Sequence, residues 1–169
     1  AAMARADGVP TVEEFFTAAT ARSVAAREGR AAAILGRHVF AHINDVHDFF
    51  EGVGALLAPD GMLLIEVPYL GTLIEHLEFD TIYHEHLSYL AAQPMSTLCE
   101  RHGFTLVDAE PVALHGGSLV FSMQRAGHGR GPALRLGTLL AHERRSRLTH
   151  PETLQAFAER VRRWKQGFE

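Results

Sequence analysis

The chain has 169 residues, and 47% of them are hydrophobic, so it can bury the core of one domain of ordinary size. Its formal net charge of -4 excludes the basic surplus that binds phosphates, and we expect no nucleic-acid polymer as a partner. No apolar run approaches the roughly 18 residues of a membrane span, and no signal sequence is evident, so we expect a soluble protein.

The first predicted elements are a helix and a buried strand. Residues 11–27 show helical spacing of apolar side chains, with Thr11 as the N-cap and Glu14 three residues later, the pattern of a capping box. Residues 31–40 contain a short apolar run that ends in Gly36, which is typical of a strand buried in a parallel sheet.

A second helix and a second strand follow directly. Residues 44–61 place their apolar side chains on one helical stripe, and we expect Pro59 and Gly61 to end this helix. Residues 62–68, "MLLIEVP", then predict a buried strand. The order strand, helix, strand implies a parallel sheet.

The next part of the chain predicts two more helices and an antiparallel pair of strands. Helices are expected within residues 69–79 and 94–104. Residues 105–114 and 118–124 are strand-like, and "HGG" at residues 115–117 favours a hairpin turn in which glycines take positive φ.

A glycine-rich linker at residues 126–132 predicts a domain boundary. The first domain would cover residues 1–125, and the second part would cover residues 126–169, with helices at 134–147 and 151–168. Basic residues of this tail are interspersed with acidic ones and predict a solvated helical face. These basic residues are Arg144, Arg145, Arg147, Arg160, Arg162, Arg163 and Lys165.

Polar side chains follow both predicted parallel strands. His42 follows the first strand, Tyr69 follows the second, and a cluster at residues 83–86 comes one helical segment later. Ligands of an open parallel sheet bind outside the carboxyl ends of its strands. We therefore expect these side chains to meet at one edge of the sheet.

The sequence around this cluster, "TIYHEHLSY", has three interpretations. His84 and His86 are spaced like two metal ligands, with His42 or His115 as the third. In the second interpretation His86 is a general base, since an imidazole changes charge near neutral pH, and Tyr83 donates to a developing oxyanion. The third is a polar loop whose histidines bind local backbone groups.

Other residues have structural interpretations. Cys99 is the single cysteine, which excludes a disulfide framework and favours a reducing, cytoplasmic setting, and we expect it in the core. His47, His76 and His102 fall within predicted helices and are expected to be exposed. The sequence contains neither G-x-G-x-x-G nor G-x-x-x-x-G-K-[ST], so it lacks the glycine loop that would bind a dinucleotide or a phosphate.

Three stretches occur in order and with close spacing: "VFAHINDVHDFFEGVGALLAPDGMLLIEVPYL", "LEFDTIYHEHLSYL" and "LCERHGFTLVDAEPVALHGGSL". Together they resemble the sugar C-methyltransferases that act on deoxysugar nucleotides in antibiotic biosynthesis. The string "FDTIYHEH" is the most specific part of the resemblance.

The resemblance implies a three-part enzyme that uses S-adenosylmethionine (SAM). Its parts are an N-terminal zinc-binding domain, a central doubly wound, Rossmann-like methyltransferase domain of the α/β class, and a C-terminal domain. Residues 1–125 are expected to form the second half of the central domain, ending in the antiparallel hairpin, and residues 126–169 to begin the C-terminal domain. The zinc ligands and the glycine-rich SAM loop of the family have no counterpart in this sequence, and we expect no metal site here.

The resemblance also implies site residues. His86 would be the base, with Tyr83, Glu85 and His42 lining the sugar site. Three residues of the segment "LGRHVFAH" would border SAM: Gly36, Arg37 and His38.

The implied reaction is methylation at carbon. A sulfonium methyl is already electrophilic, so the demanding step is to form a carbon nucleophile beside the ketone of a nucleotide-linked 4-keto deoxysugar. His86 would abstract the C3 proton, Tyr83 or His42 would stabilise the oxyanion, and Glu85 would position a ring or a sugar hydroxyl. The alternatives are a methyltransferase for another small molecule, a noncatalytic methyltransferase-like module and a metal-dependent hydrolase.

Overall fold

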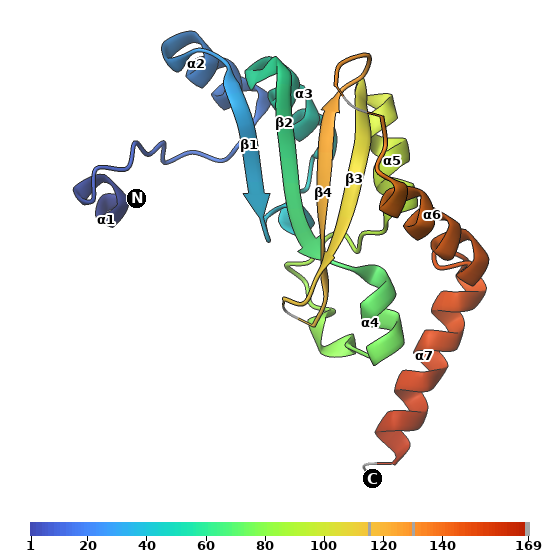
Figure 1. The fold of residues 1–169 in the computed structure, drawn as a ribbon. Coiled ribbons are helices and arrows are strands. Elements are labelled where there is room, and N and C mark those ends of the chain that lie inside the picture. Colours follow the sequence, from blue (N-terminus) through green and yellow to red (C-terminus); the bar gives the residue numbers. More distant parts are fainter. Residues whose placement is uncertain (115, 130, 168–169) are drawn as a thin grey trace.

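The computed structural model describes residues 1–114, 116–129 and 131–167 as a four-stranded sheet flanked by helices (Figure 1). The strands are β1 (Ala31–Arg37), β2 (Leu57–Pro68), β3 (Phe104–Val112) and β4 (Ser118–Arg125). The α-helices are α1 (Ala2–Ala6), α2 (Ala18–Glu28), α3 (Val46–Leu56), α4 (Leu70–His76), α5 (Ala92–Arg101), α6 (Leu134–Ser146) and α7 (Pro151–Gln166). Two short 3-10 helices are η1 (Phe40–His42) and η2 (Phe79–Thr81). None of the helices in these ranges combines the length and the apolar character that crossing a bilayer requires.

The sheet combines parallel and antiparallel pairing in the order β1-β2-β4-β3. β1 and β2 pair in parallel, with α3 as the crossover helix, as the order of predicted elements implied. β4 pairs antiparallel with both β2 and β3. The predicted α/β class, with a sheet that ends in an antiparallel hairpin, is confirmed. β1, β2 and β3 all end at the edge where Figure 1 shows α4 and the hairpin turn.

The hairpin turn between β3 and β4 requires glycine. Gly116 and Gly117 have φ values of +80° and +126°, a region that other residues rarely adopt. A Cβ at Gly116 would lie 2.4 Å from Glu78 Oε1, and one at Gly117 would lie 2.8 Å from Thr72 Cγ2. The turn therefore fits closely against the segment that follows β2. His115, which the sequence offered as a metal ligand, lies outside the described residues.

The core lies between the sheet and its covering helices. Its largest fully buried side chains are Phe40, Phe50, Phe104, Phe121, Leu57, Leu63, Ile65, Met95, Leu119, Met123, Val53 and Val67. Cys99 of α5 is buried, as expected, and burial raises the pKa of its thiol to about 12. It therefore stays protonated at neutral pH and packs as a small apolar side chain.

The first long helix begins later than the capping-box pattern predicted. The N-cap of α2 is Thr17, whose hydroxyl accepts a hydrogen bond from the Thr20 amide at 3.1 Å. Residues 9–16 are not helical: Phe16 contacts a ring of α3, whereas Phe15 is 92% exposed. The assignment of Thr11 as the N-cap was wrong. Phe15 and Phe16 point to solvent and to the core in turn, as in an extended segment, and the helix begins only after them.

The second strand begins earlier than predicted. Its pairing with β1 starts at Leu57 and, after an irregularity, resumes at the predicted first residue, Met62. α3 ends directly before Leu57, so Pro59 and Gly61 lie within β2 and do not end the helix. α3 ends because Leu57 pairs with Ala31 of β1. The residue pattern did not predict this pairing.

The helices of the C-terminal part are confirmed within the described residues. α6 packs against β3 and α5, and its Leu136 belongs to the core. Arg135 pairs with Asp108 and Glu110 of β3, which places the start of α6 beside that strand. α7 then extends away from the sheet, past the end of α4 (Figure 1).

Two histidines connect α3 with the C-terminal end of α5. His47 Nδ1 lies 2.8 Å from His102 Nε2, and the ring of His102 stacks on Phe50. His47 and His76 are exposed, as expected, but His102 is half-buried. Partial burial, together with the neighbouring His47, lowers the pKa of His102.

This pair predicts a pH-dependent stability. Because folding disfavours protonated His102, the unfolded chain binds more protons, and the free energy of unfolding is expected to decrease as pH falls through the ordinary imidazole value of 6.5. His102→Gln should remove this part of the decrease. Urea denaturation on both sides of that value measures it, with His84→Gln, an exposed histidine, as the control. The same pH dependence in His102→Gln and the unmutated protein would contradict the prediction.

Candidate active site

The sheet edge at which β1 ends carries several of the predicted site residues. β1 ends at Arg37, one residue beyond the predicted Gly36, because His38 takes a left-handed conformation (φ 52°) and turns the chain into η1. Phe40 is fully buried at the start of η1, and His42 is exposed at its end. The buried ring therefore fixes the short helix that places His42 at this edge.

The histidine loop, which we define as residues 77–91, connects α4 to α5 and lies against η1. The Leu87 amide donates to the carbonyl of Ala41 at 2.8 Å. This bond joins the loop to the 3-10 helix that ends in His42. The structure thus brings together the two regions that the sequence predicted to converge.

The environment of His86 defines its neutral tautomer. The ring is half-buried, and its centroid lies 4.2 Å from that of Tyr83 and 4.9 Å from that of His42. Nδ1 lies 2.9 Å from the carbonyl oxygen of Thr81, and Nε2 lies 3.0 Å from the Tyr83 hydroxyl. Because a carbonyl only accepts, Nδ1 carries the proton and Nε2 accepts from the phenol. An unprotonated Nε2 is what a general base requires.

The neighbours of His86 contribute in different ways. His42 Nδ1 lies 2.8 Å from the Glu85 carbonyl oxygen and donates to it, which leaves His42 Nε2 on the other side of the ring. Within the described residues the Glu85 carboxylate makes no hydrogen bond or ion pair, and it is exposed. His84 is exposed as well. The structure therefore groups Tyr83, His42 and His86, with Glu85 joined to them through its backbone.

The predicted cofactor-bordering residues surround a buried carboxylate. Glu66 of β2 is 5% exposed, and Arg37 Nε donates to its Oε2 at 2.6 Å. Nε2 of His38 lies 3.1 Å from Glu66 Oε1, and the His38 amide donates to the Glu66 carbonyl at 2.8 Å. The hydrogen bond from Arg37 lowers the pKa of Glu66, so the carboxylate is charged at neutral pH. Gly36 precedes them in β1, where a Cβ would lie 3.0 Å from Ile65.

A concavity of about 600 Å³ lies beside His42, between η1, the start of α3 and the segment that precedes α2. Apolar side chains form much of its wall, and three carboxylates stand around it. The apolar residues are Phe15, Phe16, Val39, Ile43 and Phe49, and the carboxylates are Glu14, Asp45 and Asp48.

The metal interpretation finds no geometric support in the part of the chain that the structure describes. In that part, no three histidine, cysteine or acidic side chains are grouped so that they could hold a metal ion. His86 already contacts Thr81 and Tyr83 through its two ring nitrogens.

Sequence reasoning missed two groups of this site. Glu66 is a single charged residue inside the apolar run "MLLIEVP", and that exception was the available signal. The carbonyl of Thr81, which sets the tautomer of His86, is a backbone atom and leaves no trace in the residue pattern.

Comparisons with known proteins agree with this fold. Residues 5–109 match the family described as methyltransferase domain, and residues 113–169 match the one described as C-methyltransferase C-terminal domain. The fold and the first match define a methyltransferase domain. The chain belongs to this family.

Individual relatives are similar to different extents. The C-methyltransferase NovU of Streptomyces niveus is 42% identical over 167 residues, which cover 96% of this chain and 39% of that protein, so the chain spans about two fifths of its length. A 1,6-didemethyltoxoflavin-N1-methyltransferase from Burkholderia thailandensis, solved with bound 1,6-didemethyltoxoflavin and S-adenosylhomocysteine, is 19% identical with a TM-score of 0.48, covering 74% of this chain and 55% of that one. A SAM-dependent methyltransferase from Anabaena variabilis is 12% identical with a TM-score of 0.48, covering 69% and 58%.

Proposed function

We propose that this protein is a SAM-dependent C-methyltransferase that methylates the carbon next to the ketone of a nucleotide-linked 4-keto deoxysugar. The observation that carries the proposal is the position of His86 beside His42, with Nδ1 against the Thr81 carbonyl and Nε2 against the Tyr83 hydroxyl. Its place near the carboxyl end of β1 supports the proposal, since ligands of open parallel sheets bind at that edge. The similarity to NovU, named a C-methyltransferase, supports transfer to carbon.

His86 is the proposed base. Nε2 abstracts the acidic proton beside the ketone, and the bond from Nδ1 to the Thr81 carbonyl stabilises the imidazolium that forms. The Tyr83 hydroxyl, which donates to Nε2 in the structure, must leave this nitrogen before the proton is taken, and it is then free to donate elsewhere.

Tyr83 and His42 are the proposed partners of the enolate oxygen. Both lie next to His86, so a ketone whose α-carbon is near Nε2 has the Tyr83 hydroxyl within reach as a donor. His42, whose Nδ1 donates to the Glu85 carbonyl, can donate through Nε2 only in its protonated form. Donors that are positioned before the reaction stabilise the negative charge as it develops. Glu85 is proposed to bind a sugar hydroxyl with its exposed carboxylate.

The residues of the concavity fit part of a methyl donor. Its apolar wall suits a flat purine ring, and the negative charges of Glu14, Asp45 and Asp48 suit a positive sulfonium. SAM, when bound, supplies an electrophilic methyl group. Gly36, Arg37 and His38 are proposed to border it, with Glu66 fixing the orientation of the last two side chains.

The proposed domain boundaries are those predicted from the sequence. Residues 1–125 would form the part of the methyltransferase domain that carries the base, and residues 126–169 would begin the C-terminal domain. A zinc-binding domain and a glycine-rich SAM loop belong to the family resemblance, and no residues of this chain are proposed for them.

Product analysis tests the proposal. The full-length protein is incubated with [methyl-13C]SAM and a nucleotide-linked 4-keto deoxysugar, and the product is examined by NMR. The expected result is a 13C methyl group bonded to the carbon next to the ketone. A label on oxygen would show a methyltransferase of another kind, and SAM binding without transfer to any of a panel of ketosugars would favour a noncatalytic module.

A further inference from the structure

Two charged side chains of the C-terminal helices contact the two helix ends that flank the histidine loop, residues 77–91. The loop begins where α4 ends and finishes where α5 begins. Arg160 of α7 contacts the first of these helix ends, and Glu143 of α6 contacts the second. Each charge has the sign that the dipole of its helix end favours.

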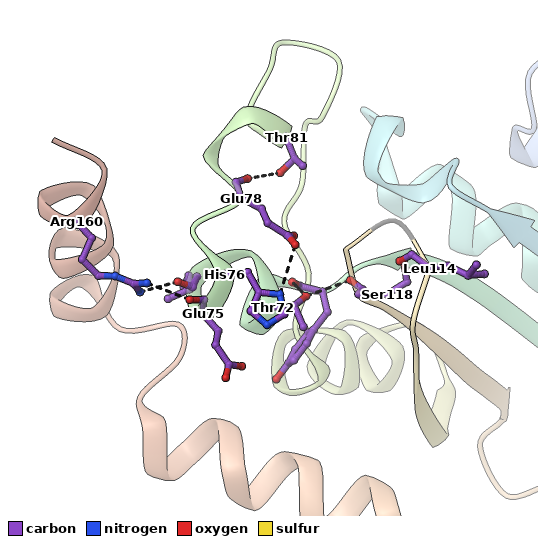
Figure 2. Close-up of polar contacts among 11 residues, drawn as sticks. Thr72, Glu75, His76, Glu78, Thr81, Leu114, Ser118 and Arg160 are labelled. Atoms are coloured by element: carbon purple, nitrogen blue, oxygen red, sulfur yellow. Dashed lines mark hydrogen bonds and ion pairs between the residues drawn. The ribbon is translucent and has the colours of Figure 1, made fainter. Parts of the chain in front are cut away.

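At the first end, Arg160 donates to the carbonyls of Ile74 and Glu75 in the last turn of α4, at 2.7 and 3.0 Å (Figure 2). Carbonyls in this position lack partners within their own helix, so a guanidinium satisfies them. Trp164, one turn further along α7, packs its ring against Phe79 of η2 at a centroid distance of 5.0 Å. α7 therefore contacts both the end of α4 and the first part of the loop.

At the second end, Glu143 accepts hydrogen bonds from the amides of Ala92 and Gln93 at the start of α5, at 2.8 and 2.9 Å. Glu143 is 3% exposed, so these are buried, charge-assisted hydrogen bonds, which are stronger than neutral ones. Burial, together with the nearby Glu143 carboxylate, raises the pKa of Tyr69 at the end of β2. The Glu143 carboxylate of α6 thus lies close to the sheet edge that carries the candidate site.

Between these ends the loop reaches the sheet edge through its backbone. The Leu87 amide donates to Ala41, and the Leu70 amide donates to the Leu90 carbonyl at 2.9 Å. A loop that is fixed at both ends has fewer conformations to lose when it orders. Contacts at its ends therefore favour the single arrangement in which His86 lies beside His42.

We propose that Arg160 and Glu143 are positioning residues, through which the C-terminal helices keep the histidine loop in the arrangement that places His86 beside His42. Each acts through the backbone of a helix end and not through contact with reacting atoms. The consequence for catalysis rests on the proposed function, whereas the consequence for the order of the loop does not.

Hydrogen exchange, followed by mass spectrometry, tests the effect on the loop. Arg160→Met removes both donors and keeps the aliphatic stem, and Glu143→Gln removes the charge at the start of α5. The matched controls are Arg163→Met and Glu159→Gln, exposed residues of α7. The readout is the exchange rate of residues 77–91 relative to that of β2 and β4, because a general loss of stability accelerates exchange in the strands at least as much as in the loop and so does not raise the ratio.

We expect this ratio to rise at least roughly tenfold in Arg160→Met and in Glu143→Gln, and to stay within about twofold in the controls. In the full-length enzyme, kcat should fall while the KM for SAM stays within about twofold, since the donor concavity is formed by other elements. An unchanged ratio in both variants would overturn the proposal, even where one of them is globally destabilised. A raised ratio in an enzyme that transfers no methyl group to carbon would support the positioning role and reject the proposed function.

Discussion

The variant His86→Asn is expected to reduce methyl transfer by the full-length protein by roughly 10²–10⁴-fold, the usual contribution of a general base. Asparagine can still donate to the Thr81 carbonyl, so the loop should keep its conformation, but it offers no basic nitrogen at the position of Nε2. Initial rates with a saturating ketosugar measure the loss, and calorimetry should show unchanged SAM affinity.

His84→Asn is the matched control for this prediction. His84 lies in the same loop, is exposed, and makes no hydrogen bond or ion pair within the described residues. We expect it to retain nearly full activity. If both variants retain full activity, His86 is not the base, whereas equal losses in both would indicate a general effect of the loop.

The second large effect is expected in the core beneath His42. Phe40 is fully buried, and its ring packs against those of Phe49 and Phe50 at centroid distances of 5.2 and 6.1 Å. Phe40→Ala removes these contacts and leaves a cavity, so we expect the free energy of unfolding to fall by about 3–5 kcal/mol. Urea denaturation followed by circular dichroism measures the change.

Phe15→Ala is the control for the core prediction. Phe15 is 92% exposed, so its removal should change the free energy of unfolding by less than about 0.5 kcal/mol. A loss of less than about 1 kcal/mol in Phe40→Ala would contradict the role of Phe40 in fixing η1. Since η1 ends in His42, the same variant should also weaken catalysis in the full-length enzyme.

The sequence predicted the order of the strands because they are apolar runs between clear breaks. The burial predicted for the first strand was wrong: β1 lies at the edge of the sheet, and its Leu35 is 62% exposed. "MLLIEVP" and the glycines of the hairpin turn each indicate their structure locally, and Gly116 and Gly117 do take positive φ. The N-terminal cap was predicted wrongly because Thr11 and Thr17 are chemically alike. Only tertiary packing of Phe16 decides where the helix begins.

The candidate site was predictable in its residues but not in its contacts. The sequence predicted that His42 and His86 lie near each other, because both follow parallel strands whose carboxyl ends meet at one edge of the sheet. The pairing of Arg37 with Glu66 depends on the register of β1 and β2, which residue types do not encode. The contact of Arg160 was not predictable either. The interspersed charges of the tail predicted a solvated face for it, but its guanidinium contacts α4.

The most direct test of the account is the exchange of the sugar proton with solvent. The full-length protein is incubated in D₂O with the nucleotide-linked 4-keto sugar, and deuterium at the carbon next to the ketone is followed by NMR. We expect rapid incorporation by the unmutated protein and by His84→Asn, and a rate at least roughly 100-fold lower in His86→Asn. Incorporation by His86→Asn at the unmutated rate would contradict this expectation.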